Sequence, residues 1–493
     1  MAVKQPNMKA ADSPIVMKAG DTAARETAAQ KAVEATINET PEVASALAAR
    51  GIPATYDSNN RAYVELAGTT DELHVIGEYL TSYQPARNAF LNALVNRIGL
   101  TIVTSKLYRN PWAVFKRGYL EFGDTIEEIF VNLADVHGFY PEGAEDTFAK
   151  RELPDVRTAF HRMNFQKFYK TTVSSQQLRQ AFLSWTGVSD LVARIIESLY
   201  TSANTDEYYV MRYFLAKCLL NGYIGSVEIP AIGKDNAVDI ATQFQYMSDL
   251  FQYQSTKYNM AGVTTHTDFE DQYFIVTAKF KATMNMNVLA TAFNLEYREF
   301  QARMITVDTF TDFDWVRMDA LFTDPATGKL DPNYHRFTRE EITLLETVPA
   351  VLVSRDWWMV LDNYVESAQW FNGEGVYWNH WHHVWKTISC SPFGQAAAFT
   401  PTAPTITSVT VTPATATLSK GADLQLNAAV VGTGIVNQGV QWKVTGGTAS
   451  GTTVTNGGYL HVAANETATT LTVTATSIQD GTKTGESTIT VTA

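Results

Sequence analysis

The chain has 493 residues, which at about 150 residues per domain predicts two to four domains. Hydrophobic residues make up 45% and aromatic residues 12%, so a sizeable core can be buried and a wholly disordered chain is excluded. The 51 acidic residues outnumber the 38 basic ones and give a net charge of −13, which excludes a protein that binds nucleic acid through bulk positive charge.

Two cysteines, Cys218 and Cys390, are too few for a disulfide scaffold and for a cysteine-based zinc site. Both lie among aromatic and apolar residues, and we expect buried thiols. The first 29 residues have no apolar stretch typical of a signal peptide, and no run of about eighteen apolar residues predicts a membrane span. The sequence therefore predicts folding in a reducing cytoplasm and no membrane partner.

The N-terminal segment, residues 1–49, is rich in Ala, Thr, Glu and Lys and contains no aromatic residue. This composition predicts a flexible or weakly helical arm. Aromatic residues become dense from about Tyr56 to Phe399, where helical and strand-like patterns are mixed. We therefore expect an α+β domain over residues 50–399.

Helix and strand patterns both occur in this middle segment. Apolar residues at i, i+3, i+4, i+7, i+8 and i+11 from Val188 to Leu199 predict a helix, and the pattern continues from Tyr208 to Leu219, with Gly222 as its stop. Strand-like runs occur at 102–104, 274–276, 350–353 and 377–388.

The chain changes character after a proline-containing linker at residues 400–404. Residues 405–493 contain no Arg and one Trp, and about one quarter of them are Thr. Apolar residues alternate with polar ones, as from Leu424 to Val430, and Gly-rich turns separate the runs. About seven short strands predict an Ig-like β-sandwich, with Trp442 as the core aromatic residue.

No P-loop, dinucleotide-binding glycine motif, metalloprotease motif, serine-hydrolase motif or paired-cysteine motif is present. His380 and His382 share one face of a predicted strand and are candidate metal ligands, with Glu374 as a third. His383 is predicted on the opposite, aromatic face. The alternative is an aromatic sheet with hydrogen-bonded histidines.

Six aspartates form a second candidate site, because paired carboxylates can perform acid–base chemistry or bind Ca²⁺. Their spacing lacks the central Gly and the Glu of an EF-hand loop, and two Asp-Pro pairs around Gly328 predict turns. We expect a solvated loop. The six are Asp308, Asp312, Asp314, Asp319, Asp324 and Asp331.

Two smaller groups remain. Arg355 and Asp356 are candidates for an ion pair or a bridge between subunits, and Trp357 and Trp358 for core or interface anchors. The basic pairs Lys116-Arg117 and Lys150-Arg151 are expected to form pairs between subunits rather than a phosphate track.

An ordered set of segments over about 300 residues resembles the major capsid protein of short-tailed, phi29-like phages of the Picovirinae type. The C-terminal segment resembles the bacterial Ig-like group-2 family, through Val411-Thr412-Pro413, Trp442-Lys443-Val444 and Val473 to Thr476. Both segments occur together in that capsid protein. The capsid-like segments are 96–100, 110–118, 125–129, 151–156, 160–161, 181–185, 206–208, 288–294, 356–363, 375–379 and 383–385.

The resemblance implies the α+β tailed-phage capsid fold (the Johnson, or HK97-like, fold), with peripheral and axial subdomains, over residues 50–399. The helix at 188–199 is the candidate spine helix, and residues 115–130 are the candidate extended loop that reaches a neighbour. The all-β Ig-like group-2 domain follows at 405–493. The arm at 1–49 and an insertion near 310–345 depart from the pattern. Removal in maturation, an assembly aid and binding to an adjacent subunit remain open as roles of the arm.

The resemblance also implies a function. We expect a structural protein without enzyme activity that assembles as hexamers and pentamers into an icosahedral or prolate head around phage dsDNA, without sequence-specific DNA binding. Assembly in the host cytoplasm would place it in the virion. Further implied partners are scaffolding, portal or connector, and head-decorating proteins.

The C-terminal domain would touch host-surface glycans or brace neighbouring capsomers. The alternatives are a cell-surface adhesin and a glycan-active enzyme. No catalytic, cofactor-binding or metal-binding residue is assigned.

Overall fold

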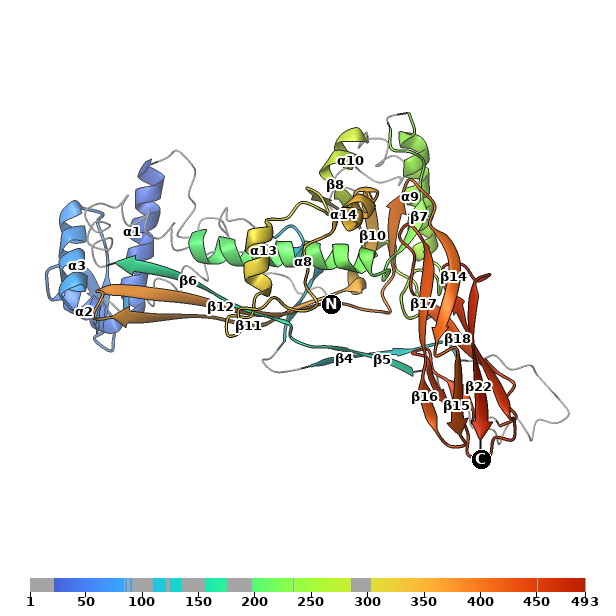
Figure 1. The fold of residues 1–493 in the computed structure, drawn as a ribbon. Coiled ribbons are helices and arrows are strands. Elements are labelled where there is room, and N and C mark those ends of the chain that lie inside the picture. The colour runs from blue at the N-terminus through green and yellow to red at the C-terminus, as the bar shows by residue number, and fades with distance from the viewer. Residues whose placement is uncertain are drawn as a thin grey trace, which may run out of the picture.

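The molecule is elongated, with a helical N-terminal unit at one end, a central body around a long helix, and an all-β region at the other end (Figure 1). A long β-hairpin connects the N-terminal unit to the body. The computed structural model describes residues 22–83, 85–86, 89–90, 110–120, 125–134, 156–174, 197–233, 235–284, 303–449 and 451–492.

The hairpin consists of β11 (Trp358–Asn372) and β12 (Tyr377–Cys390), which pair antiparallel along their length. They form the centre of a four-stranded sheet in the order β3-β11-β12-β6, with β3 (Lys116–Tyr119) and β6 (Phe165–Ser174) at its edges. Alternating residues of β12 therefore face opposite sides of the sheet.

A second, five-stranded sheet forms the centre of the body, in the order β7-β13-β10-β8-β9. Both of its faces are buried, because Val351 and Val353 contact the core around α8 (Ser202–Leu220), whereas Ala350 and Leu352 contact the core under α9 (Ala237–Phe251). Its strands are β7 (Gly225–Glu228), β8 (Gln272–Thr277), β9 (Met304–Val307), β10 (Ala350–Ser354) and β13 (Ala396–Thr400).

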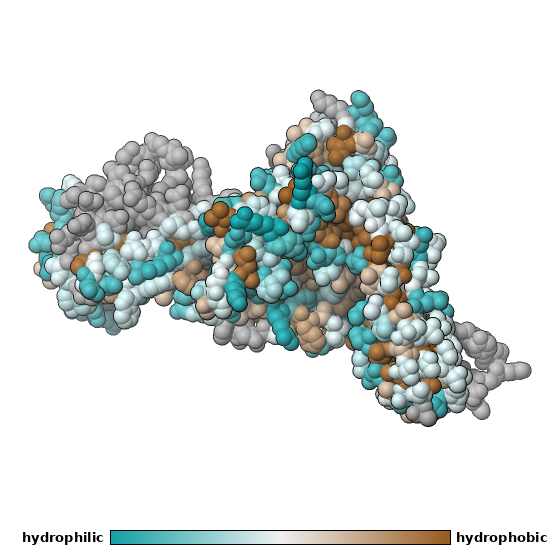
Figure 2. All heavy atoms as spheres, in the orientation of Figure 1, coloured by the Kyte–Doolittle hydropathy of each residue, from teal (hydrophilic) through white to brown (hydrophobic). Residues whose placement is uncertain are grey.

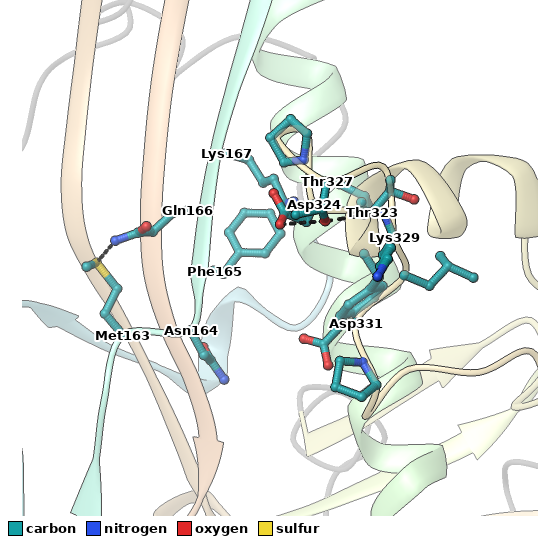
Figure 3. A pocket seen from close by; sticks show the side chains of 15 residues that line it. Met163, Asn164, Phe165, Gln166, Lys167, Thr323, Asp324, Thr327, Lys329 and Asp331 are labelled. Atoms are coloured by element: carbon teal, nitrogen blue, oxygen red, sulfur yellow. Dashed lines mark hydrogen bonds between the residues drawn. The ribbon is translucent and has the colours of Figure 1, made fainter.

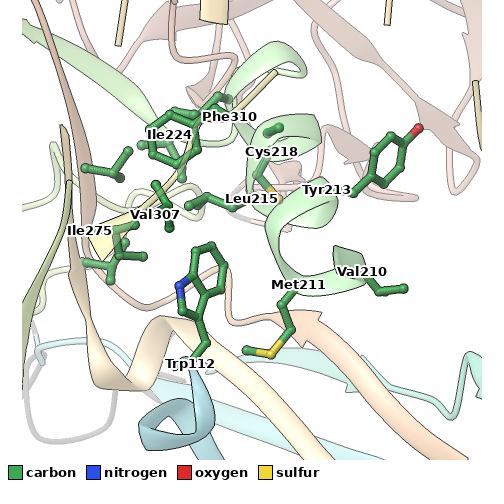
Figure 4. Packing of buried hydrophobic residues seen from close by; sticks show 14 of the residues in the cluster. Trp112, Val210, Met211, Tyr213, Leu215, Cys218, Ile224, Ile275, Val307 and Phe310 are labelled. Carbon is green, nitrogen blue, oxygen red and sulfur yellow. The ribbon is translucent and has the colours of Figure 1, made fainter. Parts of the chain in front are cut away.

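Helix α8 is the long helix of the body. It follows a π-helical turn, Glu197–Thr201, and ends at Leu220, where Gly222 takes a positive φ of 70°. The predicted helix stop at Gly222 is confirmed, because glycine adopts this conformation at little cost. Figure 4 shows Met211 and Leu215 of α8 near Trp112, with Cys218 further along the helix in the same core. The first part of the candidate spine helix, 188–196, lies outside the described residues.

Residues 22–48 are not a flexible arm. They form α1 (Thr22–Glu39) and α2 (Pro41–Ala48), which pack with the elements that follow around one core. The helical alternative of the prediction agrees with the structure here, whereas the flexible one was wrong. The buried side chains, such as Val33, Ile37 and Leu47, are aliphatic, so the lack of aromatic residues hid the core. The remaining elements are β1 (Ala54–Tyr56), β2 (Ala62–Val64) and α3 (Thr70–Ser82).

A two-stranded antiparallel ribbon of β4 (Ile126–Val131) and β5 (Val156–His161) extends from the body towards the C-terminal strands (Figure 1). The candidate extended loop at 115–130 begins too early. Phe115 is fully buried, and residues 116–119 are β3, paired with β11. Trp112 and Phe115 pack this segment into the core, and the two-stranded ribbon starts only at β4.

Residues 308–346 cover α8 with α13 (Trp315–Phe322) and α14 (Arg339–Glu346). Phe337 stacks on Tyr213 of α8 with ring centroids 5.1 Å apart. The segment is therefore a packed cover, whereas its status as an insertion remains a prediction. The short elements of the body are η2 (Ala113–Phe115), η4 (Phe269–Asp271), α10 (Ala278–Thr283) and η5 (Arg355–Trp357).

The C-terminal region is all-β, and its strands surround one hydrophobic core that includes Leu426, Leu471 and Ile489. Trp442 is half-buried against this core. The described residues of this region form nine strands rather than about seven, and the group-2 assignment stays a prediction. The strands are β14 (Thr405–Thr412), β15 (Thr415–Ser419), β16 (Asp423–Gln425), β17 (Asn427–Thr433), β18 (Val440–Thr445), β19 (Thr453–Val454), β20 (Tyr459–His461), β21 (Thr470–Ser477) and β22 (Thr484–Thr492).

This region is docked firmly onto the body. Ile435 is buried in the core around α8, and the Ser226 hydroxyl donates to its carbonyl at 2.7 Å. The backbone N–H of Gln438 donates to the Gly222 carbonyl at 2.9 Å. The loop after β17 thus closes over the end of α8.

Candidate assembly surfaces

One face of the β4–β5 ribbon exposes four apolar side chains together with Glu127 and Thr158. Ile129 and Val131 point to the same side as Val156 and Phe160, because the register pairs Val131 with Val156 and Glu127 with Phe160. Ile129 is 59% and Phe160 61% exposed. Contiguous exposed apolar side chains of this kind mark protein interaction sites.

The other face of the ribbon is fixed to its own subunit. Phe130 stacks on Phe393 with centroids 5.3 Å apart. The Glu128 carboxylate accepts a hydrogen bond from the Ser391 hydroxyl at 2.9 Å and lies 3.2 Å from His161 Nε2. The ribbon therefore presents its apolar face outward on a held support.

A second apolar surface lies on the long hairpin. Trp370 is 70% exposed and Phe168 of β6 is 59% exposed. Phe168 lies 5.7 Å from the His383 ring, and Lys170 lies 5.7 Å from the Trp381 ring centroid. The predicted aromatic face around Trp381 and His383 is confirmed.

A cluster of charged side chains lies where α8 meets the base of the hairpin. Glu207 of α8 accepts hydrogen bonds from Lys386 of β12 and from Asn110 at 2.7 Å. Lys116 lies 3.4 Å from Glu207 and 2.7 Å from Asp362 of β11. Lys386 also donates to Asp362 at 2.5 Å. The cluster ties together four segments that are distant in sequence.

The electrostatics of this cluster favour its charged form. Burial alone would raise the pKa of Glu207, but the ammonium groups of Lys386 and Lys116 outweigh it, and the net pKa is lowered. The pKa of Asp362 is lowered against its own burial by the same two groups. For Lys386, burial lowers the pKa, whereas Glu207 and Asp362 raise it to about 12. The ion pairs thus compensate the burial of their members.

His380 and His382 lie on one face of β12, but no third candidate ligand joins them among the described residues. His380 is fully buried, and its ring nitrogens have no hydrogen-bond partner in the described part of the chain. His382 lies 3.1 Å from the Ser367 hydroxyl and packs on Tyr200. Glu374 is exposed in the hairpin turn. No cluster of three or more potential metal ligands occurs among the described residues.

Five of the six aspartates between 308 and 331 serve separate structural roles. Asp308 pairs with Arg212, Asp314 caps α13, and Asp319 pairs with Arg336. Asp324 and Asp331 hold turns, which confirms the turns predicted at the two Asp-Pro pairs. The predicted solvated loop holds only for the turns, because the segment around them packs on α8.

A cavity of about 570 Å³ opens between the start of β6 and the loop at 321–332 (Figure 3). Asp324, Thr327 and Lys329 lie on one side, and Lys167 lies on the other. Asp324 already accepts bonds from Ala326 N–H and the Thr327 hydroxyl. These groups stabilise the loop and do not converge on a reaction centre.

The basic pair at 116–117 acts within the subunit, so the expectation of pairs between subunits is wrong there. Arg117 pairs with Asp356 at 3.0 Å and donates to the Trp358 carbonyl at 2.9 Å. Asp356 is thus paired with Arg117 and not with Arg355. Trp357 and Trp358 are core anchors. Lys150-Arg151 lies outside the described residues.

Sequence reasoning missed the Glu207–Lys386 pair. The two residues are 179 positions apart, so no local spacing joins them. One signal was present, because Lys386 falls on the same alternating face of β12 as Trp378 and Val384, both of which are buried. A lysine on a buried face requires a carboxylate partner.

Comparison with known proteins decides the family. The family model of the phi29-like phage major capsid protein matches residues 54–400. The chain belongs to this family. The major capsid protein of Bacillus phage B103 is 33% identical over 83% of this chain and 85% of its own length, and that of Bacillus phage GA-1 is 33% identical over 73% and 71%.

Among solved structures, the capsid of Staphylococcus phage Andhra covers 60% of this chain and 85% of its own, with a TM-score of 0.46 and 15% identity. The family match confirms the α+β phage capsid fold that we expected from the sequence. It is a structural protein of the virion capsid shell that assembles with copies of itself. The adhesin and enzyme alternatives are not supported. No helix in the described segments is long and apolar enough to cross a membrane.

Proposed function

We propose that neighbouring subunits join through the apolar face of the β4–β5 ribbon. The observation that carries the proposal is the exposure of Ile129, Val131, Val156 and Phe160 on one side of a ribbon whose other side is held. In a protein that assembles with its own copies, burying this face on a neighbour would remove apolar area from water at about 25 cal/mol per Å². Contacts repeated around rings of five and six would close the shell.

Substitutions on this face test the proposal. Ile129→Asp and Phe160→Asp each place a charge on the ribbon without touching the subunit core. We expect a folded subunit, with unfolding free energy within about 0.5 kcal/mol of the wild type, and loss of closed heads in electron micrographs. Val316→Asp, on an exposed side chain of α13, is the matched control and should still assemble. Normal heads from both ribbon variants would refute the ribbon contact and leave the family membership untouched.

The shell would enclose dsDNA without sequence-specific contacts. The net charge of −13 supports this, because an acidic inner wall would let packed DNA slide rather than adhere. Scaffolding, portal and head-decorating proteins are the further partners that such a shell needs. A strongly basic inner surface in assembled heads would contradict the sliding wall.

The C-terminal domain is a second candidate for binding, through a neutral hydroxyl-rich face. β15, β22, β21 and β18 form one sheet whose outward positions are mostly threonines, and the visible surface of this region has intermediate hydropathy (Figure 2). Such a face suits weak contacts with neutral host-surface glycans, multiplied by many copies. The threonines are Thr415, Thr417, Thr445, Thr470, Thr472, Thr474, Thr476, Thr484, Thr488, Thr490 and Thr492.

The paired threonines Thr472 and Thr488 allow a direct test. Thr472→Arg with Thr488→Arg would cover the centre of this face and should reduce adsorption of heads to host cell-wall glycans. Thr410→Arg, at an exposed position of β14, is the control. Unchanged adsorption with weakened shells would favour the alternative, a domain that braces neighbouring capsomers.

A further inference from the structure

The turn at the end of the long hairpin holds one residue in a backbone conformation that its side chain disfavours. β11 ends at Asn372 and β12 begins at Tyr377, so residues 373–376 form the turn. Val376 has a φ of 53°, in the left-handed region, where a branched Cβ is crowded by the backbone. Among the described residues, the other non-glycine residue with positive φ is Asn60, a residue type that tolerates this region. The strain at position 376 therefore comes from the choice of valine.

The turn is held in place by its own residues. Asn372 Oδ1 accepts hydrogen bonds from the N–H of Glu374 at 3.0 Å and of Gly375 at 2.9 Å, and Asn372 Nδ2 donates to the Tyr377 hydroxyl at 3.1 Å. A Cβ atom at Gly375 would lie 2.2 Å from the Tyr377 ring, so glycine lets this ring close against the turn. A strained residue persists only where its surroundings fix it. These contacts fix the backbone of Val376.

The end of the hairpin also exposes apolar side chains. Val376 is 49% exposed and Trp370, close to the turn in β11, is 70% exposed. Trp370 faces away from the N-terminal core, because the next residue, Phe371, packs with Trp378 against that core, with their ring centroids 4.8 Å apart. This end of the hairpin lies at the N-terminal unit, far from the C-terminal strands (Figure 1). Strain and exposed apolar surface thus occur together at one end of the subunit.

We infer that the end of the hairpin, through Trp370 and Val376, contacts a neighbouring copy of this chain in the assembled shell. The contact would remove from water the apolar surface that the single subunit exposes, and this gain would offset the strain at Val376. The fixed turn would lose little conformational freedom when the neighbour docks. The inference rests on assembly of the chain with its own copies and not on the proposed ribbon contact.

The small size of the exposed surface favours another subunit over a separate partner protein. A stable interface between two proteins buries about 1,200–2,000 Å² in total, whereas even a large aromatic side chain such as Trp370 buries only about 150–250 Å². The end of the hairpin alone would not hold a free partner. In a closed shell, other contacts already hold the neighbouring subunit, so a small contact adds to them in every copy.

Val376→Asn tests the inference, because asparagine adopts the same backbone conformation more readily but has no apolar side chain. We expect the isolated subunit to melt at or above the wild-type temperature, because the strain is relieved. Heads of the variant should dissociate at a lower guanidinium concentration, followed by light scattering. The affinity of each contact should fall by about three- to tenfold, as expected for a valine that is half exposed before contact.

Two further variants complete the test. Trp370→Thr should also give heads that dissociate earlier, while its isolated subunit melts as the wild type does. Val316→Asn is the matched control, because Val316 is an exposed valine on helix α13, and it should change neither measurement. If a variant alone forms no heads, heads assembled from a mixture with wild-type subunits replace them, and earlier dissociation of the mixed heads would support the contact.

Three results would overturn the inference. A lower melting temperature of the Val376→Asn subunit would show that valine is favoured by contacts within its own subunit. Variant or mixed heads as resistant as wild-type heads would exclude a contact between copies. Heads of normal resistance that form in low yield would indicate a separate assembly protein at the hairpin end. Normal heads from the ribbon variants would not affect these results, because the two sets of substitutions change different surfaces.

Discussion

At the scale of single residues, Lys386 is a buried lysine whose charge depends on two carboxylate partners. Its ammonium group is buried at the base of the hairpin and is balanced by Glu207 and Asp362. Ion pairs of this kind contribute little net stability when intact, but removing one partner leaves a buried charge uncompensated.

Glu207→Gln should therefore destabilise the subunit by about 3–5 kcal/mol, because two ammonium groups lose their buried carboxylate. Chemical denaturation of the isolated subunit would measure this value. Glu366→Gln, on the exposed part of β11, is the matched control, with an expected change below about 0.5 kcal/mol. Equal effects of the two variants would show that the cluster adds nothing.

The same cluster predicts how stability depends on pH. The pKa values of Glu207 and Asp362 are lowered from 4.5 and 3.8, so their contribution is complete above those values and is lost as the pH falls through the lowered ones. The pKa of Lys386 is raised from 10.5 to about 12, so its contribution is complete below 10.5 and is lost as the pH rises towards 12. The contribution of the cluster to the unfolding free energy should therefore be constant between about pH 5 and 10. The whole subunit should already lose stability below about pH 6.5, because burial lowers the pKa of His380 and His382 to about 4. In Glu207→Gln the acid limb should be shallower.

At the scale of elements, α1 takes the place of a β-strand neighbour. Asn38 donates to the Val64 carbonyl at 3.0 Å and accepts from the Val64 N–H at 2.7 Å. One and two turns earlier, Glu34 accepts from Leu66 N–H and Gln30 donates to the Leu66 carbonyl. The side chains at positions 30, 34 and 38 lie on one face of α1, and they thus satisfy the backbone N–H and carbonyl groups of Val64 and Leu66.

Asn38→Ala should lower the stability of the N-terminal unit by about 1–3 kcal/mol, because it removes two hydrogen bonds from partly buried backbone groups. Faster hydrogen exchange at Val64 would report the loss. Asn59→Ala, in an exposed turn, should leave that exchange unchanged. Exchange at Val64 as slow as in the wild type would mean that α1 does not hold this edge.

The docking of the C-terminal domain depends on Gly222. A Cβ atom there would lie 2.4 Å from the Val436 carbonyl oxygen, and φ is positive. Gly222→Ala should therefore loosen the docked loop and speed proteolysis at residues 401–404. Gly328→Ala separates the two causes, because Gly328 also has a positive φ but open space around it. It should cost about 1–2 kcal/mol of local strain and leave proteolysis at the linker unchanged.

At the scale of the whole molecule, the C-terminal domain is part of the subunit's fold. Ile435 contributes to the core around α8, so deleting residues 405–493 removes a core side chain and exposes the end of that helix. We expect the truncated subunit to melt several degrees lower and to aggregate, as loss of a buried Ile predicts. Replacing only the exposed Thr472 and Thr488 should not change the melting temperature. A truncated subunit as stable as the full chain would show that the docked C-terminal domain does not contribute to the stability of the rest of the subunit.

Patterns in the sequence predicted those features that depend on neighbouring residues. Alternation placed His380 and His382 on one face of β12, and Gly222 ended α8 where the helical pattern stopped. The partners across the fold could not be read in this way. Trp378 packs into a core made by α1 and α2, more than 300 residues earlier, and Glu207 meets Lys386 only because α8 crosses the hairpin. The predicted start of the extended loop, residue 115, was too early. No local pattern shows that Trp112 and Phe115 are buried, because their contacts come from distant parts of the chain.

The hairpin also has a mechanical consequence. Its fifteen-residue strand β11 is about 50 Å long at roughly 3.3 Å per residue, with the charge cluster near its base and Trp378 in a separate core at its tip. A rigid beam of this length displaces its tip by roughly 0.9 Å for every degree of tilt at the base. Small differences in tilt would let one subunit fit both five-fold and six-fold positions of a curved shell while its own cores stay intact.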